Sequence, residues 1–539
     1  MIRLSAILAC LLAAMPVLPA AAAPMVLGVQ THFAQGWPID LLDIAKDSGA
    51  PTIRDGVGWA GVEKSPGNYD FAGGKHIATA CRKGFDVLAV VEPRNRLYDG
   101  GAVVASDPGR NALAAFVLAM LDKYPCVIAI EVGNEINGNN WFAGPAAADP
   151  AGSYVALLRT LYPAVKARHP KVAVLGGSTN VIGIGFLESL FARGMLDVVD
   201  GVVVHPYRSR AESVDMEFTA LNDAMRRHGP IRPIWATEFS DNFNTPEMAP
   251  PMLLKMVAMM SASNVERAYW YALIDQRWFR NMGLYEWRVP KPAAHAFIAA
   301  QGLLRDGSAV RLATEERDSF IYRFGNGAYV MWGAPRPISF SGTVRVRNAQ
   351  GQQIATPAAL ADEPIIVEGA SGYTLGTREV LADSLYGFGQ APWSYVARKS
   401  DGSEMPMRWT NGRWTSNYSV RGVSDLWVAA GTVAAGPKSP PIETVVRYTA
   451  PESGRVKISA CLTKPPKGDG MLITIRRGDE QFFQGKIFDR LLLTEMPIVL
   501  QAGDRLDFAF RPLGAPGGNL VSPRIRIVRE DAALTPACL

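Results

Sequence analysis

The sequence predicts an α/β protein in which a (β/α)8 barrel is followed by two all-β sandwich domains. From about residue 26 to residue 305, short apolar runs alternate with helical stretches, and about eight such units fit a length typical of these barrels. Polar or ionisable residues end nearly every apolar run. Beyond residue 305 the helical period disappears, and short strand-like runs are joined by Asn-Gly and Gly-rich turns. The length of 539 residues suits several domains.

The apolar runs of the first region are expected to be the barrel strands. Because they are apolar throughout rather than alternating, they suit parallel strands covered on both faces. In chain order they are "VLGVQTH", "PTIRDG", "DVLAVVEP", "CVIAIEVGNE", "VAVLGGST", "DGVVVHPY", "PIWATEFS" and "RAYWYALID". Segments between them, such as "PGRNALAAFVLAMLDKY", are long enough for covering helices. A doubly wound open sheet is the alternative, but the number of units and the polar strand ends favour a closed barrel.

The predicted boundaries give a barrel over residues 24–305, a small β-sandwich over 306–380 and a jelly-roll-like sandwich over 381–539. The last domain is a candidate carbohydrate-binding module, because exposed aromatic side chains present flat apolar faces to sugars. The aromatic residues concerned are Trp393, Trp409, Trp414, Tyr418 and Trp427. The alternative is that they form the core of the sandwich, where aromatic side chains are usually buried.

The N-terminus has the layout of a secretory signal peptide. Residues 1–23 combine an early Arg3, an apolar stretch and a run of small residues that ends near Ala23. Pro16 and Pro19 interrupt a stretch that is already short for a membrane anchor. No later apolar run is long enough to span a bilayer. The mature protein is therefore expected to be secreted or periplasmic, without a membrane span.

Charge and cysteine content narrow the function classes. The net charge of +5, from 55 basic and 50 acidic residues, is too mild over this length to indicate nucleic acid as a partner. Cys81, Cys126, Cys461 and Cys538 remain after signal cleavage and permit two disulfides in an oxidising compartment. Pairing by region joins the first two and the last two, and buried free thiols are the alternative. The six scattered histidines and the absence of a CxxC pair predict no metal and no other cofactor.

Functional side chains are expected at the carboxyl ends of the strands, where barrels of this kind carry their active sites. The residues at these ends are His32, Arg54, Glu92, Asn134, Glu135, His205, Tyr207, Glu238 and Trp270. Glu135 ends the fourth strand and Glu238 the seventh, so the two carboxylates can face each other across the barrel opening. Such a pair at roughly 5 Å is typical of retaining glycoside hydrolysis, and a wider gap is typical of inversion.

These residues resemble the clan A glycoside hydrolases, with most similarity to family 39, which includes β-xylosidases, iduronidases and exopolysaccharide-cleaving relatives. The clan pattern is an Asn-Glu pair after strand four and a lone Glu after strand seven, which Asn134-Glu135 and Glu238 in "WATEFS" match. The resemblance implies that Glu135 is the general acid/base and Glu238 the nucleophile. Gly133 and Ile136 depart from the usual Trp-Asn-Glu-Pro form.

The resemblance also implies roles for the neighbouring residues. Asn134 would bind the substrate 2-hydroxyl, His205 and Tyr207 in "VVVHPY" would position the nucleophile, and Trp270 in "YWYALI" would stack on the sugar. Arg54 in "TIRDG" would keep the nucleophile ionised.

Residue chemistry supports these assignments. Burial is expected to raise the pKa of the acid Glu135, while cationic and hydroxyl neighbours keep Glu238 charged. Trp141 is expected to line a neighbouring subsite, and Glu92 and His32 to contact sugar hydroxyls. Glu131, in the same "EVGNEINGNNW" stretch, is interpreted as a buried structural acid.

The predicted function is that of a secreted, metal-independent retaining glycoside hydrolase acting on a β-linked poly- or oligosaccharide. A bacterial exopolysaccharide is favoured, because export and accessory sandwiches suit a large extracellular polymer. An exo-acting β-xylosidase-like enzyme is one alternative. A non-catalytic polysaccharide-binding or assembly protein is another, and a transglycosylase would use the same residues.

Overall fold

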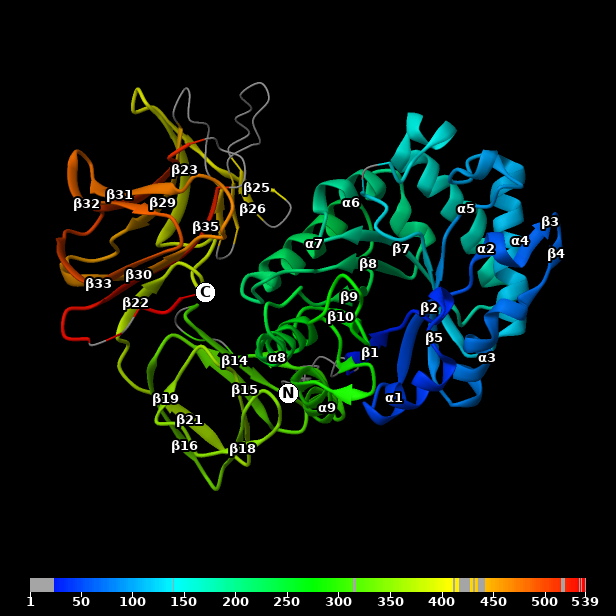
Figure 1. Ribbon diagram of the computed structural model, residues 1–539, viewed down its shortest axis with the longest axis horizontal. Helices are drawn as coiled ribbons and strands as arrows, with labels where there is room; N and C mark the ends of the chain where they lie inside the picture. The colour runs from blue at the N-terminus through cyan, green and yellow to red at the C-terminus, as the bar shows by residue number, and fades with distance from the viewer. Residues whose placement is uncertain are drawn as a thin grey trace, which may run out of the picture.

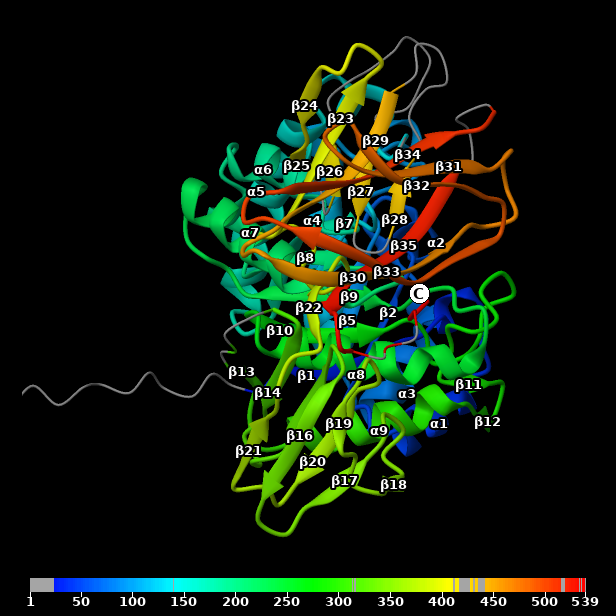
Figure 2. The ribbon, with the colours of Figure 1, turned by 90° about the vertical axis from the view of Figure 1, so that its left-hand side faces the viewer.

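The computed structural model describes residues 24–138, 140–312, 314, 317–410, 413–415, 427–429, 432–434, 442–514, 519–532, 534 and 536–538. The predicted signal peptide, residues 1–23, lies outside the described residues. Figure 1 shows a barrel surrounded by helices on one side and two β domains on the other. Figure 2 shows the β domains one above the other, with β22 between them.

The first region is a closed barrel of eight parallel strands in the order β1-β10-β9-β8-β7-β6-β5-β2. Strand β1 pairs with both β2 and β10, which closes the sheet and excludes the open-sheet alternative. The strands are β1 (Val26–Gln30), β2 (Thr52–Gly56), β5 (Asp86–Val91), β6 (Val127–Val132), β7 (Ala173–Asn180), β8 (Gly201–His205), β9 (Ile234–Phe239) and β10 (Val265–Trp270). Each of the eight predicted runs supplies one strand, so the predicted (β/α)8 barrel is confirmed.

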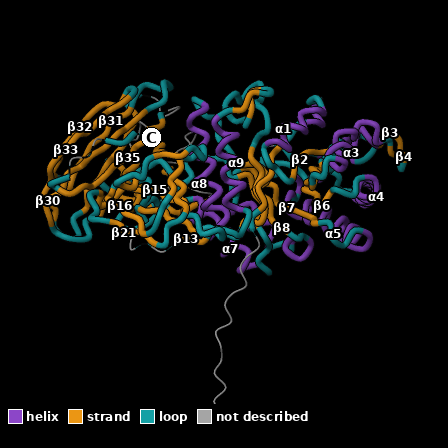
Figure 3. Tube along the Cα trace, turned by 90° about the horizontal axis from the view of Figure 1, so that it is seen from below, coloured by secondary structure: helices purple, strands orange, loops and turns teal. Residues whose placement is uncertain are grey.

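Helices follow the strands and cover the barrel (Figure 3). The α-helices are α1 (Leu42–Asp47), α2 (Trp59–Val62), α3 (Lys75–Arg82), α4 (Asp107–Lys123), α5 (Pro150–Arg168), α6 (Ile184–Phe191), α7 (Val214–His228), α8 (Ala249–Ser261) and α9 (Pro292–Leu304). Helix α4 begins after Ser106, whose hydroxyl accepts from the Gly109 amide, and Asp149 caps α5 through the Gly152 amide. The short hairpins β3–β4 (Glu63–Ser65, Asn68–Tyr69) and β11–β12 (Tyr285–Glu286, Val289–Pro290) extend the loops.

The barrel interior is filled at one level by one buried side chain from each of six neighbouring strands. They are Leu88, Ala129, Leu175, Val203, Trp235 and Tyr269. A much larger apolar cluster lies between the strands and the helices. The interior is therefore a packed core, and functional groups can gather only at the strand ends.

The second region contains two antiparallel sheets that pack on the barrel. One has the order β13-β14-β15-β20-β17-β18 and the other β19-β16-β21. The strands are β13 (Val310–Arg311), β14 (Ser319–Arg323), β15 (Tyr329–Gly333), β16 (Arg336–Ser341), β17 (Arg345–Arg347), β18 (Gln353–Ile354), β19 (Ala359–Leu360), β20 (Ile365–Glu368) and β21 (Gly372–Leu375). Phe320 and Trp332 belong to the same apolar cluster as the outer barrel residues, so this domain shares a core with the barrel.

The third region is a second sandwich with its own apolar core. Its sheets run β25-β26-β27-β28-β35-β30-β33, with β22 paired to β35, and β24-β23-β29-β34-β31-β32. The strands are β22 (Val380–Asp383), β23 (Trp393–Lys399), β24 (Glu404–Pro406), β25 (Arg408–Thr410), β26 (Arg413–Thr415), β27 (Trp427–Ala429), β28 (Thr432–Ala434), β29 (Ile442–Thr449), β30 (Gly454–Thr463), β31 (Met471–Arg477), β32 (Glu480–Ile487), β33 (Arg490–Leu500), β34 (Arg505–Pro512) and β35 (Leu520–Arg529). Two sandwiches after the barrel confirm the predicted fold class.

The aromatic residues of the last domain do not form one exposed surface among the described side chains. Trp393 is buried in the core, as the core interpretation predicts, and Trp409 is half-buried against Phe388. Trp414 and Trp427 lie on β26 and β27, but their side chains are outside the described part of the chain, as is Tyr418.

Both disulfides expected from pairing by region are present. Cys81, at the end of α3, bonds Cys126 just before β6, and Cys461 on β30 bonds Cys538 near the C-terminus. The first ties two neighbouring barrel units together and the second holds the C-terminal segment to the last sheet. Among the described helices, none has the length and apolar character needed to cross a bilayer.

Candidate active site

A cavity of about 680 Å³ opens at the carboxyl ends of the barrel strands. Its walls come from all eight strand ends or the loops that follow them, with Tyr207 as the contribution of the loop after β8. Arg54, Glu92, Asn134, Glu135 and Glu238 all line it. The predicted gathering of polar strand ends is therefore present in three dimensions.

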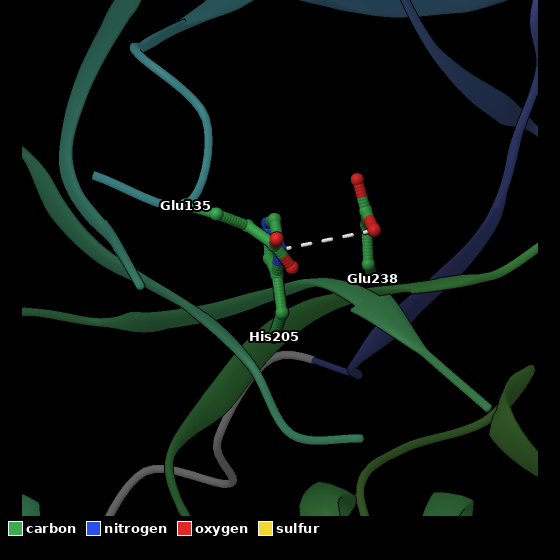
Figure 4. Close-up of side chains that lie close together, drawn as sticks. All are labelled: Glu135, His205 and Glu238. Atoms are coloured by element: carbon green, nitrogen blue, oxygen red, sulfur yellow. Dashed lines mark hydrogen bonds and ion pairs between the residues drawn. The ribbon is translucent and has the colours of Figure 1, made fainter. Parts of the chain in front are cut away.

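The two predicted catalytic carboxylates lie together in this cavity. Glu238 is in β9, and Glu135 is in the turn after β6, and they approach His205 from different elements (Figure 4). Within this group of three, one oxygen of Glu135, one oxygen of Glu238 and a ring nitrogen of His205 are all within 4.8 Å of one another. Glu135 has a φ of 47°, and Gly133 a φ of 82°, so a tight turn brings this carboxylate to the opening.

Arg54 holds the base of the site together. Its guanidinium donates to both oxygens of Glu131 at 2.7 and 2.9 Å, to Glu238 at 2.5 Å, to Gln30 at 2.6 Å and to Asn134 Oδ1 at 2.8 Å. A guanidinium has five N–H donors, so all of them are used. Burial acts against the charge, but Glu131 and Glu238 raise the pKa of Arg54, so it stays cationic.

Glu238 accepts hydrogen bonds from two side chains. Arg54 donates to Oε1 and the Tyr207 hydroxyl donates to Oε2 at 2.6 Å. The residue is 8% exposed, and it faces the cavity between these two partners. The guanidinium and the hydroxyl therefore fix the orientation of this carboxylate toward the cavity.

His205, at the end of β8, is buried between three carboxylates. Its Nδ1 lies 3.3 Å from Glu135 and 3.7 Å from Glu238, and its Nε2 lies 3.4 Å from Glu131. Burial opposes the charge, but the three acids raise the pKa of His205 to about 9. It is therefore an imidazolium near neutral pH. It contacts these carboxylates from behind the cavity wall and does not line the cavity itself.

The expectation that burial raises the pKa of Glu135 is wrong. The hydrogen bond from His205 lowers the pKa of Glu135, burial acts in the opposite direction, and Asn180 donates Nδ2 to the same oxygen at 2.8 Å. The side chain is 34% exposed, so burial is too weak to outweigh these two donors.

Glu131 is fully buried beneath the catalytic pair, as its interpretation as a structural acid predicts. Besides Arg54, the Ser178 hydroxyl donates to it at 2.6 Å and His205 faces it. Burial opposes ionisation, but Arg54 and His205 hold the pKa of Glu131 well below its usual range. Its charge fixes the two cations that in turn orient Glu238 and Glu135.

Two predicted aromatic contacts are corrected by the structure. Trp270 is fully buried, packs against Phe239 and Phe243, and donates its indole N–H to the Met282 carbonyl at 2.8 Å. It does not line the cavity; the next residue, Tyr271, does. The predicted stacking position therefore falls one residue later.

Trp141 is also buried rather than lining a subsite. A Cβ on Gly133 would lie 2.8 Å from the Trp141 ring and 2.6 Å from Ile136, so these two side chains fill the space above Gly133. The usual tryptophan before the Asn-Glu pair is missing, and a tryptophan eight residues later packs beside the same turn. This packing accounts for both departures from the clan pattern.

The remaining predicted residues, Asn134, Glu92 and His32, line the cavity. Arg54 donates to Asn134 Oδ1, which leaves the amide nitrogen of Asn134 to donate to a substrate hydroxyl. His32 is edge-on to Tyr271 with ring centroids 5.3 Å apart, and burial lowers its pKa, so the ring is neutral.

Several cavity residues were not predicted. Asp55, Asn180, Asp241, Tyr271 and Phe279 all line it, and Asn180 contacts Glu135 directly. Asn180 is the last residue of β7, so the rule that used the other strand ends could have found it.

Glu135, His205 and Glu238 are also close enough together to be considered as metal ligands. A histidine ligand must offer a neutral nitrogen to the ion. Here both ring nitrogens face carboxylates, and the pKa of His205 is raised to about 9. These residues therefore suit a hydrogen-bonded charge network better than a cation site.

No protein-family model matches the chain, and no curated protein matches it. Solved structures do match at low identity. A GH39 β-xylosidase from Caulobacter crescentus is 18% identical with a TM-score of 0.47, over 67% of this chain and 98% of that chain. A monomeric β-xylosidase from Caulobacter crescentus CB15 is 14% identical with a TM-score of 0.44, over 92% and 98%. A GH5_18 protein from Bifidobacterium longum subsp. infantis is 17% identical with a TM-score of 0.42, over 54% and 81%.

Proposed function

We propose that the protein is a retaining glycoside hydrolase with Glu238 as nucleophile and Glu135 as general acid/base. The observation that carries the proposal is the approach of the two carboxylates, with oxygens within 4.8 Å, across a cavity at the strand ends. Retaining enzymes hold their acids about 5–5.5 Å apart, whereas inverting enzymes need about 6.5–9.5 Å for a water between acid and sugar. The short gap favours a direct attack by Glu238.

In the first step, Glu238 attacks the anomeric carbon while protonated Glu135 gives its proton to the departing glycosidic oxygen. The carbon–oxygen bond to the leaving group breaks, and an ester to Glu238 forms. Arg54 and Tyr207 fix Glu238 for this attack. Substrate that displaces water from the cavity raises the pKa of Glu135 and so favours its protonated form. The Nδ1 of His205 lies 3.3 Å from a carboxylate oxygen of Glu135 and can supply the proton.

In the second step, Glu135 acts as a base toward water, which attacks the anomeric carbon and releases Glu238. Formation of the ester removes the negative charge of Glu238, which lowers the pKa of Glu135 and prepares it to accept a proton. The hydrogen bonds from His205 and Asn180 favour the same ionised form. The anomeric configuration is inverted twice and therefore retained.

The proposed substrate is a β-linked polymer outside the cytoplasm, with a bacterial exopolysaccharide favoured. The signal-like N-terminus supports export to the periplasm or medium, and two β domains beside the barrel suit an enzyme of extracellular polymers. An exo-acting β-xylosidase-like enzyme is a second candidate, and a transglycosylase would differ only in its acceptor. A non-catalytic binding protein is disfavoured, because binding alone does not require a fixed pair of opposed acids.

The test measures the stereochemistry of the product and identifies the residue that forms the covalent intermediate. Purified protein is screened on polysaccharides and aryl β-glycosides, and NMR records the configuration of the first product formed. A 2-deoxy-2-fluoro glycoside of the sugar that is cleaved is then used to trap the ester, and the labelled peptide is sequenced. We expect a β-product and a label on Glu238. An α-product, a label elsewhere, or no turnover on any substrate would contradict the proposal.

A further inference from the structure

The cavity is acidic although the protein as a whole is basic. Five acidic residues line it, Asp55, Glu92, Glu135, Glu238 and Asp241. Arg54 is the single lysine or arginine among the lining residues that the structure describes. The whole sequence carries a formal charge of +5, so the negative charge is a local property of this site.

The cation in the cavity has no donor left for a ligand. All five N–H groups of Arg54 are taken by Glu131, Glu238, Gln30 and Asn134. His32 is neutral, because burial lowers its pKa. A substrate carboxylate would therefore meet several negative charges and no available cationic donor, which is unfavourable in a partly buried site.

The acidic residues of the cavity differ in the number of hydrogen bonds that their carboxylates accept from the protein. Asp55 accepts from the Thr31 hydroxyl and from three backbone amides, those of Phe33, Ala34 and Gly56. By contrast, the Glu92 carboxylate takes part in no hydrogen bond or ion pair among the described residues. It follows β5 at the carboxyl end, lines the cavity and is half-buried.

The surroundings of Glu92 favour a ligand that donates to it. Its closest cation in sequence, Arg94, is engaged with the ring and carbonyl of Trp141. Burial raises the pKa of Glu92, as expected for a carboxyl that lacks a partner. The Nε2 of His32, buried and without a hydrogen-bond partner in the described structure, is a second unsatisfied group on the cavity wall. Ionised Glu92 accepts from hydroxyl or amino donors, and a hydroxyl, which both donates and accepts, can pair with Nε2 of His32 in either tautomer.

We propose that this cavity accepts a neutral or amino-bearing sugar and rejects uronic acids, with Glu92 as the specificity-determining residue that receives a substrate hydroxyl or ammonium group. The inference rests on the proposed function for its catalytic readout. A hydroxyl satisfies an acceptor that the protein leaves open, and an ammonium group adds a charge pair. A carboxylate in the same place leaves two like charges facing each other.

The experiment compares matched aryl glycosides that differ only in charge. The 4-nitrophenyl β-glucoside, its 2-amino-2-deoxy analogue and the β-glucuronide form one set, and the corresponding galactosides form a second. We expect kcat/KM for the uronide to be at least about 100-fold below that of the neutral partner in any set that is cleaved. Glu92→Gln should reduce this gap about tenfold or more, because it removes the charge and keeps the shape.

Glu266→Gln is the matched control. Glu266 is exposed near the start of β10, at the opposite end of the barrel from the cavity, so the same chemical change there should leave the ratio unaltered. A uronide cleaved as well as its neutral partner, or a ratio that Glu92→Gln does not move, overturns the inference.

Binding separates a failure of this inference from a failure of the proposed function. If no set is cleaved, ligand-observed NMR with the methyl β-glucoside, glucosaminide and glucuronide is carried out on the unmodified protein. Preference for the first two over the uronide, lost in Glu92→Gln, supports the inference although the catalytic proposal has failed. Equal binding of all three, or binding of none, overturns it.

Discussion

Two buried networks of arginine and carboxylate differ in how many of their carboxylate oxygens remain accessible to a ligand. At the strand-end cavity, Arg54 and His205 are set among Glu131, Glu135 and Glu238. At the junction of the two β domains, Arg524 and Arg526 on β35 face Asp362 and Asp383. Both networks are formed by residues that are far apart in the chain.

At the junction, the buried carboxylate is saturated. Asp383 Oδ2 accepts from Arg524 at 2.9 and 3.0 Å and from Arg526 at 2.8 Å, and Oδ1 accepts from the Leu385 amide at 2.9 Å. Arg524 also reaches Asp362 of the first β domain at 2.7 Å. This network therefore fixes one domain on another.

At the cavity, only Glu131 is enclosed in this way, while Glu135 and Glu238 keep faces directed at the opening. The comparison shows that the same pairing of charges fills every acceptor of Asp383 at the junction and leaves acceptor faces of Glu135 and Glu238 open at the cavity. Substitutions in the cavity network should therefore reduce activity, and substitutions in the junction network should reduce the free energy of unfolding.

The largest expected effect is on activity. Glu238→Gln keeps an acceptor for Arg54 but removes the nucleophile, so kcat/KM should fall by at least about 10⁴-fold. The free energy of unfolding should change by no more than about 1 kcal/mol, because Arg54 keeps Glu131, Gln30 and Asn134. Steady-state kinetics and urea unfolding of the same preparation measure both quantities. Residual activity within about tenfold of the unmodified enzyme would contradict the assignment.

The next effect is on stability. Asp383→Asn leaves Arg524 and Arg526 buried with one carboxylate between them, which should cost about 3–5 kcal/mol of unfolding free energy. Below the unfolding transition, kcat/KM should stay within about twofold. Calorimetry follows the transition of the last domain. Asp531→Asn, which removes an exposed partner of Arg529, is the control and should leave the unfolding transition where it is in the unmodified protein.

Two tyrosines allow the same comparison through the loss of a single hydroxyl group in each network. Tyr207 donates to Glu238 in the cavity, and Tyr386 donates to Asp362 at the junction. Tyr207→Phe should reduce kcat/KM about 10- to 100-fold with little change in stability. Tyr386→Phe should cost about 1–2 kcal/mol of stability with little change in kcat/KM. The reverse pattern, or equal effects of both variants on activity, would show that the two networks are not distinct.

The barrel could be predicted because parallel strands buried on both faces need continuous apolar runs, and each such run supplied a strand. The meeting of Glu135 and Glu238 in one cavity could be predicted because the carboxyl ends of all barrel strands lie at the same face. Which residue at the end of a strand faces the cavity could not be predicted from the sequence. Tyr269 fills the barrel interior, so alternation along β10 turns Trp270 toward the helices and Tyr271 toward the cavity, and which of the two alternating sets faces inward is fixed only in the folded barrel.

Two other features depend on contacts that the sequence does not contain. Trp141 was assigned to a subsite, because nothing in its position reveals that it packs over Gly133. The pKa of Glu135 was assigned from burial alone, whereas the contact with His205, seventy residues later in the chain, determines its direction. The direction of such a pKa shift can be predicted only when the distances between the ionisable groups are known.

The smallest expected effect follows from that contact. The active free enzyme needs Glu238 ionised and Glu135 protonated, so the lowered pKa of Glu135 places the alkaline limb of kcat/KM at acidic pH. His205→Asn removes the imidazolium and leaves Glu135 near other carboxylates, so its pKa rises. The alkaline limb should then move to higher pH by about half to one unit.

The same variant should change the dependence of stability on pH. Because the pKa of His205 is raised from 6.5 to about 9, its contribution is complete below about pH 6.5 and is lost as the pH rises through 9. Urea unfolding between pH 6 and 10 should therefore show a decline in the unmodified protein that His205→Asn lacks. His169→Asn removes a histidine that faces Asp122 outside the cavity and serves as the control. A pH–rate profile that does not move in His205→Asn would mean that His205 does not set the protonation of Glu135.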